Sequence, residues 1–478
     1  MVAIRRFPRV LQGREQASRG IRHIRRLSTL PTLSTPEVED VVIGAGVVGT
    51  CTAYSLARQG RRVKVLDRGS GPAQGSSWIN GTLICPSLML PWTGPQLIPK
   101  LLKSFFHPRH PLKVHPSVLC SLDTYYFALH YLASCRPGHG ARTTRRLANL
   151  ARYSRHCLET LLLSHPELNG FMDRKAAGTL QVFDDQTAMQ ACLDASEEIQ
   201  RAGVPLRIVR EESGSDLADR LRQTGHEALY LYSPLDTNGD CAKFTHFLER
   251  QCQELGVRFR YDSVVQGFQD KNGLWEIALR GQPPVRARNV ILCAGTGSPS
   301  LASLLGVRLP MAPVKGYAIT VPLKSGIQQL SSNVVQDSSK LYLAPLGPDL
   351  VRITGFAEFA GFDASVDMDR AMILTEQADK LLPNCLDLSR AEYHTGLRPL
   401  SADDVPIIGK VQSNFFLNTG HGSKGWTHAA GSGQLVADLV TGRQPDLDPE
   451  SYSLSRFFTL HQKDTPFDFQ FGGADFMA

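Results

Sequence analysis

A strand, a glycine-rich turn and a helix follow one another near the start of the sequence, and this succession constrains the fold more than any other feature. Val41–Ile43 is a short apolar run that leads directly into the G-x-G-x-x-G pattern of residues 44–49. Apolar residues recur at helical spacing over Val47–Arg58, and Arg62–Leu66 has the pattern of a second strand. The succession predicts a βαβ unit whose glycines let the backbone approach a pyrophosphate at the helix N-terminus.

This first turn does not decide which dinucleotide binds. Asp67 ends the second predicted strand, 18 residues after Gly49, where a carboxylate can accept hydrogen bonds from ribose hydroxyls. The neighbouring Arg68 fits three interpretations: a partner for the 2′-phosphate of NADP, a cap on a flavin adenine pocket, or a solvated surface charge.

A second glycine turn near the other end of the chain favours a flavin. Residues 418–426 read NTGHGSKGW and lie between a predicted strand, Phe415–Asn418, and a predicted helix, Gly433–Thr441. A helix N-terminus offers backbone N–H groups and a positive dipole end to a developing anion. A reduced flavin carries negative charge at one edge of its ring, whereas a nicotinamide needs no such partner. The alternative is a glycine-rich surface loop.

Arg398 is the candidate residue for a substrate acid. It lies in the segment GLRP at residues 396–399, before an apolar run around Val405–Ile408. A guanidinium can bind a carboxylate through two parallel hydrogen bonds, which an ammonium cannot do. The alternative is an arginine held in a structural ion pair. A further apolar strand, Val290–Cys293, ends in Ala294-Gly295, where the backbone can pass close to a cofactor.

Charge is concentrated in the first thirty residues. They hold eight arginines and one glutamate, so the rest of the 478-residue chain carries equal numbers of basic and acidic side chains. Because the folded body then has no net charge, the basic face that nucleic-acid binding requires is not indicated. The arginine-rich, acid-poor segment 1–35 is typical of a mitochondrial transit peptide, which predicts a location in the matrix or on the inner membrane. The alternative is a disordered basic tail.

The cysteines and apolar runs exclude two further classes of site. The ten cysteines occur singly, without a C-x-x-C pair, so no metal site is predicted and the thiols are expected to be reduced and mostly buried. No apolar run reaches the roughly 18 residues of a membrane-spanning helix. Peripheral contact with a membrane stays open.

Together these segments resemble the FAD-dependent D-amino-acid oxidase superfamily, and within it the bacterial D-amino-acid dehydrogenase small subunits. The resemblance covers residues 38–458. It is carried by the two glycine turns, by the strand end at Asp67, by Ala294-Gly295 and by six further segments: Pro91-Trp92, Gly178–Phe183, Gly239–Cys241 with Phe244-Thr245, Pro313–Tyr317, Thr395–Pro399 and Gly431–Leu435.

The resemblance implies a role for particular residues around non-covalent FAD. The pyrophosphate would be held by Gly44, Ala45, Gly46, Val48 and Gly49, and the adenosine by Asp67, Arg68, Val265, Ala294 and Gly295. Ser76 and Ser77 would contact phosphate or flavin, and the pyrimidine edge would be covered by Gly422, Ser423, Lys424, Gly425 and Trp426. Arg398 would bind the substrate carboxylate. Tyr317, Tyr342 and His421 are further pocket candidates, with a core aromatic or a satisfied loop histidine as the alternative for each.

Two positions depart from the family pattern. Many members have Asn-Ala-Gly where this chain has Asn80-Gly81-Thr82, which can reshape the wall near the flavin. Ile79 follows Trp78, where relatives that bind flavin covalently carry a histidine. The resemblance therefore implies FAD without a covalent bond to the protein.

The implied fold is α/β, with a Rossmann-like FAD-binding domain of the D-amino-acid oxidase (glutathione-reductase-2) type and an interleaved antiparallel-sheet substrate domain. We expect the FAD-binding domain at residues 38–95, 238–300 and 390–445, the substrate domain at 96–237 and 301–389, and an extension at 446–478.

The implied reaction is oxidative deamination of a D-amino acid by hydride transfer to FAD, with electrons passed to a quinone or an electron-transfer protein. Three alternatives stay open at this point. They are a sarcosine, glycine or L-2-hydroxyacid oxidase of the same fold, a non-catalytic flavoprotein that assists assembly of a respiratory complex, and an NAD(P) dehydrogenase.

Overall fold

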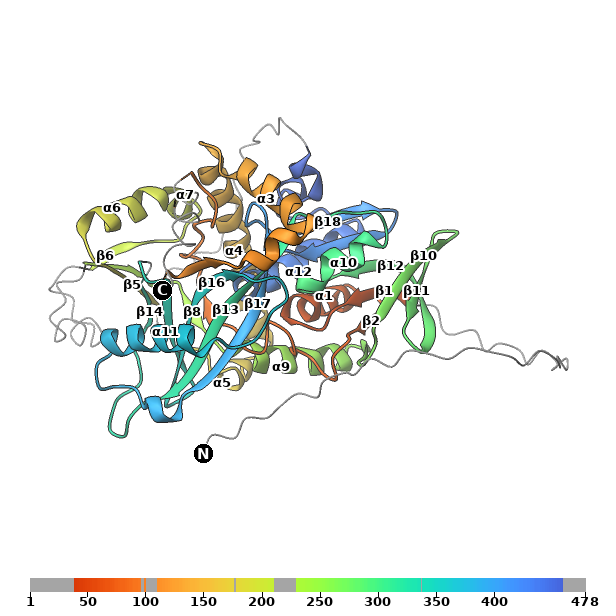
Figure 1. Ribbon diagram of the computed structural model, residues 1–478. Coiled ribbons are helices and arrows are strands. Elements are labelled where there is room, and N and C mark those ends of the chain that lie inside the picture. The colour runs from red at the N-terminus through yellow and green to blue at the C-terminus, as the bar shows by residue number, and fades with distance from the viewer. Residues whose placement is uncertain are drawn as a thin grey trace, which may run out of the picture. The chain divides into compact units, whose positions relative to one another are not determined.

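Two large β-sheets organise the described part of the chain (Figure 1). The computed structural model describes residues 38–95, 99, 110–175, 178–209, 229–336 and 338–458. The predicted transit peptide at 1–35 and the last twenty residues lie outside this part of the chain. The predicted class, α/β with an antiparallel second sheet, is confirmed.

The first sheet has eight strands and a parallel centre. Its strand order is β10-β11-β12-β1-β2-β9, and β19 pairs with both β12 and β18. The pairs that join β9, β2, β1, β12 and β19 are parallel, and their apolar residues are buried, as expected for a sheet covered on both faces. The strands are β1 (Val38–Ile43), β2 (Val63–Leu66), β9 (Arg258–Arg260), β10 (Val265–Lys271), β11 (Leu274–Leu279), β12 (Gln282–Leu292), β18 (Ile407–Gln412) and β19 (Phe415–Thr419).

Three helices pack side by side against this sheet. Helix α1 (Val47–Arg58) contacts α9 (Cys241–Glu254) and α12 (Gly425–Thr441), and α12 also contacts α4 (His139–Ser164). Strands β1, β2, β12 and β19 end at the same edge of the sheet, because parallel strands share a direction. The loops that follow these strands therefore lie near one another, which is where an open α/β sheet binds its ligand.

The second sheet has nine strands and is mostly antiparallel. Its order is β17-β13-β16-β15-β14-β5-β7-β6, and β4 pairs with β16. Helix α11 (Met368–Leu381) covers one face, as Figure 1 shows, and α3 (Leu122–Ser134) packs near β13. The strands are β4 (Leu112–Val114), β5 (Thr179–Phe183), β6 (Arg207–Val209), β7 (Leu229–Ser233), β13 (Met311–Pro322), β14 (Asn333–Gln336), β15 (Leu341–Leu346), β16 (Leu350–Phe359) and β17 (Glu392–Ser401).

The remaining elements are short. Strands β3 and β8 form a small two-stranded sheet, and helices and 3-10 turns connect the larger elements. They are β3 (Leu83–Ile84), β8 (Thr237–Asn238), α5 (Leu168–Phe171), α6 (Gln186–Ala195), α7 (Glu197–Arg201), α10 (Ser298–Ser303), and the 3-10 turns Pro116–Cys120, Gly295–Gly297, Leu388–Arg390, Pro449–Ser451 and Leu454–Phe457.

Three local differences separate the observed elements from those predicted. The pattern of residues 187–202 predicts a single helix that ends at Gly203, but the structure has two helices that meet at Ser196. Helix α12 begins at Gly425, eight residues earlier than predicted. Strand β17 lies within residues 390–445, the range predicted for the FAD-binding domain, but it pairs with β13 in the second sheet. The domain boundaries themselves stay a prediction.

Candidate active site

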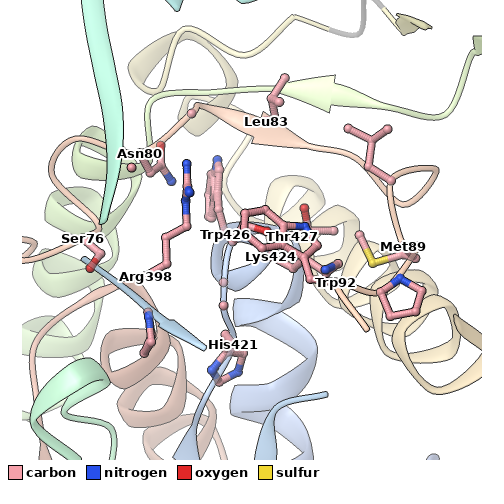
Figure 2. A pocket seen from close by; sticks show the side chains of 18 of the residues that line it. Ser76, Asn80, Leu83, Met89, Trp92, Arg398, His421, Lys424, Trp426 and Thr427 are labelled. Carbon is pink, nitrogen blue, oxygen red and sulfur yellow. The ribbon is translucent and has the colours of Figure 1, made fainter. Parts of the chain in front are cut away.

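A cavity of about 1690 Å³ lies where the two sheets meet. Its wall includes the first glycine turn, the strand end at Asp67, the loop after β12, the second glycine turn and Arg398 of β17. The cavity is larger than the roughly 300–1,000 Å³ of a typical ligand pocket, so it has room for a dinucleotide together with a small substrate. Figure 2 shows the Arg398 side chain extending from its strand into this space.

Two glycines of the first turn have no room for a side chain. Gly44 has φ of +112°, and a Cβ there would lie 2.4 Å from the carbonyl oxygen of Cys293. A Cβ at Gly49 would lie 1.9 Å from the carbonyl oxygen of Gly44. By contrast, Gly46 lines the cavity, and its nearest neighbour would be the Ser77 hydroxyl at 3.2 Å. The turn is therefore tight against the protein and open toward the cavity, which suits a pyrophosphate.

Asp67 and Ser77 support this turn with their side chains. The Asp67 carboxylate accepts hydrogen bonds from the backbone N–H groups of Ala45, at 2.6 Å, and Gly69, at 2.7 Å. The hydroxyl of Ser77 accepts from the N–H of Val47 at 3.0 Å, in the first turn of α1. The other predicted cofactor residues of this region also line the cavity: Val48, Arg68, Ser76, Val265, Ala294 and Gly295. Ala45 is buried behind the turn.

The second turn is anchored by a buried ion pair. Nζ of Lys424 lies 2.5 Å from Oδ2 of Asp404, and both side chains are buried. Asp404 also accepts a hydrogen bond from the backbone N–H of Trp92 at 2.9 Å, and burial raises the pKa of its carboxyl. Gly422 packs beside Asp404, because a Cβ there would lie 3.0 Å from Oδ1. The charge of Lys424 is therefore neutralised by Asp404 within the wall of the cavity.

Trp426 packs into the core more than it faces the cavity. It is buried, its indole N–H donates to the carbonyl oxygen of Gly239 at 3.1 Å, and its ring lies 4.5 Å from that of Phe244. Ser423 is exposed, and Gly425 begins α12. The backbone of residues 422–426 thus forms the wall, while the side chains of Lys424 and Trp426 hold that backbone in place.

Arg398 presents a cation to the cavity. Its Nη1 donates to the carbonyl oxygen of Phe356 at 2.6 Å, and Nη2 donates to that of Gly355 at 3.3 Å. The guanidinium lies 5.6 Å from the ring centroid of Trp92, and burial lowers its pKa to about 10. Among the described residues its hydrogen bonds go to carbonyls and not to a carboxylate. Because a guanidinium has five N–H donors, up to three are left for a ligand.

The other three pocket candidates lie in different surroundings. Tyr317 belongs to the core between the second sheet and α11, where burial raises the pKa of its hydroxyl. Tyr342 of β15 is half-buried and lines the cavity. His421 is buried, and its Nε2 lies 3.1 Å from the hydroxyl of Ser432. All four residues, Arg398, Tyr342, Tyr317 and His421, therefore contribute to the wall of one cavity. The side chains of Tyr317 and His421 are almost fully buried in packed surroundings.

Three residues around Arg398 and Lys424 were not predicted as part of the site. Trp92, Asp404 and Gly316 contact or flank Arg398 and Lys424, and none belongs to a cofactor motif. The nearest signals in the sequence are Pro91-Trp92 and the Asp403-Asp404 pair that follows GLRP. Among the described residues, no group of three His, Cys, Asp or Glu side chains could hold a metal ion.

Burial of His421 predicts a loss of stability in acid. Burial lowers its pKa to about 3, from an ordinary value of 6.5, so the unfolded chain binds the proton first as pH falls. The free energy of unfolding should therefore fall by about 1.4 kcal/mol per pH unit between pH 6 and pH 4 through this group alone. His421→Gln should lose that part of the slope in urea unfolding, whereas His246→Gln, at an exposed histidine of α9, should keep it. Equal slopes in all three proteins would contradict the prediction.

Comparison with known proteins gives long matches. The family model described as FAD dependent oxidoreductase (DAO) matches residues 41–439. The D-amino acid dehydrogenase of Cereibacter sphaeroides is 34% identical over 439 residues, which cover 89% of this chain and 97% of that protein. That of Xanthobacter autotrophicus is 36% identical over 423 residues, with coverage of 87% and 98%.

Solved structures show the same fold at lower identity. The crystal structure of glycine oxidase from Geobacillus kaustophilus has a TM-score of 0.68 and 19% identity, and covers 89% of this chain and 100% of its own. That of L-proline dehydrogenase from P. horikoshii has a TM-score of 0.68 and 18% identity, with coverage of 88% and 98%. At these identities the likeness concerns the fold alone.

The mitochondrial location predicted from residues 1–35 is wrong. The similar D-amino acid dehydrogenases come from bacteria, including Cereibacter, Xanthobacter and Rhizobium species. The prediction depended on arginine-rich composition alone, in a segment that lies outside the described residues. No helix in the described part of the chain is both long and apolar enough to cross a membrane.

Proposed function

The chain belongs to the FAD dependent oxidoreductase family, and from this premise we propose that it catalyses the oxidative deamination of a D-amino acid. It is an FAD-dependent oxidoreductase. The proposed substrate follows from relatives named D-amino acid dehydrogenases, which match nearly the whole chain at about one-third identity. The proposed products are a 2-oxo acid and ammonia.

The observation that carries the proposal is the guanidinium of Arg398. It lies in the wall of the cavity that also holds both glycine turns, and its hydrogen bonds among the described residues go to carbonyl oxygens. A cation in this setting favours an anionic ligand, and the planar fork of donors matches a carboxylate. Fixing the carboxylate at one end would orient the α-carbon toward the cofactor, an effect worth several kcal/mol of a reaction barrier.

The residues present fit FAD at the edge of the first sheet. Gly44, Ala45, Gly46, Val48 and Gly49 would hold the pyrophosphate at the N-terminus of α1, and Asp67 the adenosine ribose, with Arg68, Ser76, Ser77, Val265, Ala294 and Gly295 nearby. FAD supplies the acceptor for the hydride that leaves the α-carbon. Because Ile79 offers no nucleophile after Trp78, we propose that FAD is held without a covalent bond.

The second turn would stabilise negative charge. The backbone of residues 422–426 opens the N-terminus of α12 toward the cavity, and a helix N-terminus stabilises an anion. Since Asp404 neutralises Lys424, this stabilisation would come from the backbone N–H groups and the helix dipole more than from the lysine charge.

The amine of the substrate must lose its proton before the α-carbon is oxidised, since only a neutral nitrogen can share its lone pair with that carbon. Removal of the α C–H as hydride leaves an imino acid, which water hydrolyses to the 2-oxo acid and ammonia. We propose a quinone or an electron-transfer protein as the final acceptor, and this part is supported by the name dehydrogenase among the relatives.

Anaerobic titration of the purified holoprotein tests the proposal. The panel contains D- and L-amino acids, sarcosine, glycine and L-2-hydroxyacids, and bleaching of the flavin absorbance is followed. We expect bleaching by at least one D-amino acid and stoichiometric formation of a 2-oxo acid and ammonia. Bleaching only by sarcosine, by glycine or by a hydroxyacid would replace the proposed substrate, and the absence of bleaching by all compounds would overturn the proposed activity. Reoxidation by a soluble quinone analogue, compared with air, then tests the acceptor.

A further inference from the structure

Strand β16 is irregular at the point where it meets Arg398. On β13 the paired residues step from Lys315 to Tyr317, while on β16 their partners step from Glu358 to Gly355. One strand thus advances by two residues and the other by three, which is a β-bulge. Phe356 lies inside the bulge with φ of +54°, in the left-handed region that a bulky side chain rarely adopts.

The bulge turns two successive carbonyls toward the guanidinium. In a regular strand, successive backbone carbonyls point toward the two opposite neighbouring strands. Here the carbonyl oxygens of both Gly355 and Phe356 accept hydrogen bonds from Arg398. These two bonds fix the plane of the guanidinium, and with it the direction of the donors that remain.

Gly316, opposite the bulge, leaves the space that the guanidinium occupies. A Cβ at this residue would lie 2.2 Å from Nη2 and 2.4 Å from Cζ of Arg398. Gly316 pairs with Gly396, two residues before Arg398 on β17. The φ angle of Gly316 lies outside the left-handed region, so backbone conformation does not demand a glycine there. A glycine is needed there because any side chain would occupy the space of the Arg398 guanidinium.

A buried ion network holds the other face of the bulge. The Arg370 guanidinium from α11 lies 4.4 Å from the centroid of the Phe356 ring, and its Nε donates to Glu358 at 2.8 Å. Oε2 of Glu358 lies 3.6 Å from Nζ of Lys315 and 3.3 Å from Nε2 of His115. Arg370, Glu358 and Lys315 are almost fully buried. Buried ion pairs add little net stability, and their best attested use is to specify one arrangement.

We propose that the bulge at Phe356, held by Arg370 and faced by Gly316, sets the orientation in which Arg398 receives a substrate carboxylate. Gly316, Phe356 and Arg370 are then positioning residues, which act on the substrate only through Arg398. The inference rests on the proposed function, because it assumes that Arg398 binds a carboxylate.

A double-mutant cycle between Gly316→Ala and Arg398→Lys tests this inference. The probe is benzoate, a carboxylate without an oxidisable α C–H, and its Kd is measured from the change that it causes in the flavin absorbance. Gly316→Ala should raise the benzoate Kd by about 10- to 150-fold, the range expected for the loss of one charge-assisted hydrogen bond. In the Arg398→Lys background, where the guanidinium is absent, the same change should alter the Kd by at most about twofold.

Matched variants separate positioning from a general loss of structure. Gly267→Ala changes a strand glycine that also lies at a register shift, between β10 and β11, and an added Cβ there would meet only Ala278 at 3.8 Å. It should leave the benzoate Kd unchanged, and both glycine variants should retain FAD and the wild-type melting temperature. Arg370→Lys keeps a positive charge beside Glu358 but loses the planar contact with Phe356. It should also raise the Kd, and again only when Arg398 is present.

The outcomes distinguish the two proposals. A wild-type protein that does not bind benzoate, or an unchanged Kd in Arg398→Lys, overturns the carboxylate site and the inference together. If Arg398→Lys weakens binding but Gly316→Ala does not, the inference alone is overturned. It is also overturned if Gly316→Ala weakens binding by the same factor in both backgrounds, because a positioning effect requires the guanidinium.

Discussion

Replacement of Arg398 by lysine should raise the KM for the amino-acid substrate by about 30- to 150-fold, which corresponds to about 2–3 kcal/mol for a charge pair that loses its fork of hydrogen bonds. Lysine keeps the positive charge, but it has no planar set of donors and cannot bind both the carbonyls of Phe356 and Gly355 and a carboxylate. The FAD content should stay at the wild-type level, since Arg398 makes no hydrogen bond to either glycine turn among the described residues. Steady-state kinetics and the flavin-to-protein absorbance ratio measure both effects.

A matched control for this substitution is available on the surface. Arg286→Lys makes the same chemical change at an exposed residue of β12. Arg286 pairs with Glu276 and is not part of the cavity wall. Its KM should equal that of the wild type. A KM for Arg398→Lys within about threefold of the wild type would correspond to less than 1 kcal/mol, and would remove Arg398 from the substrate site.

Replacement of Gly49 by alanine should produce a protein that purifies largely without FAD. The added Cβ would lie 1.9 Å from the carbonyl oxygen of Gly44, which is backbone and cannot rotate away. Overpacking costs about 1–3 kcal/mol in well-packed sites. Because this clash is with backbone, we take the upper end of that range, which corresponds to a rise of about 100-fold in the FAD Kd. The turn must open to accept the methyl group, and it then no longer fits a pyrophosphate. Titration of the apoprotein with FAD, followed by fluorescence, gives the Kd.

The control for Gly49 is a glycine with free space around it. Gly170 is exposed in α5, and a Cβ there would have no neighbour within 4 Å. Gly170→Ala should bind FAD as the wild type does. Full FAD occupancy in Gly49→Ala would show that the turn is less constrained than its contacts indicate.

Local sequence patterns predicted the first half of the site well. The change from a short apolar strand to glycines and then to helical spacing depends only on neighbouring residues, and β1, α1 and β2 follow it closely. The start of α12 was predicted at Gly433 because glycines weaken helices. The structure explains why they are tolerated: a Cβ at Gly431 would lie 2.7 Å from Ser154, and one at Gly433 would lie 2.8 Å from Cys51. Close packing of α12 against α4 and α1 requires them, and no local pattern reports such a contact.

The residues of the second sheet around Arg398 were harder to predict, because their place in the site depends on which face of its strand each residue occupies. Tyr317 contributes to the cavity wall, but its ring is buried in a cluster with residues of α11, whereas the neighbouring Gly316 faces Arg398. A shift of one residue along a strand exchanges the two faces. The contacts of Asp404 are likewise made by the fold. Its ion pair with Lys424 joins residues 20 positions apart, and its hydrogen bond with Trp92 joins residues 312 positions apart.

The interleaving of the first sheet also determines when this protein can finish folding. Strand β12 pairs on one edge with β1, from the beginning of the chain, and on the other with β19, from near its end. A nascent chain that has not yet emerged beyond Thr419 therefore leaves the edge of β12 open at residues 290–292, and it lacks helix α12, which packs against α1. Such long-range pairing slows folding and leaves edges available for aggregation during synthesis. If FAD contacts both glycine turns, as we propose, it can be bound in full only after the second turn at residues 422–426 has been synthesised.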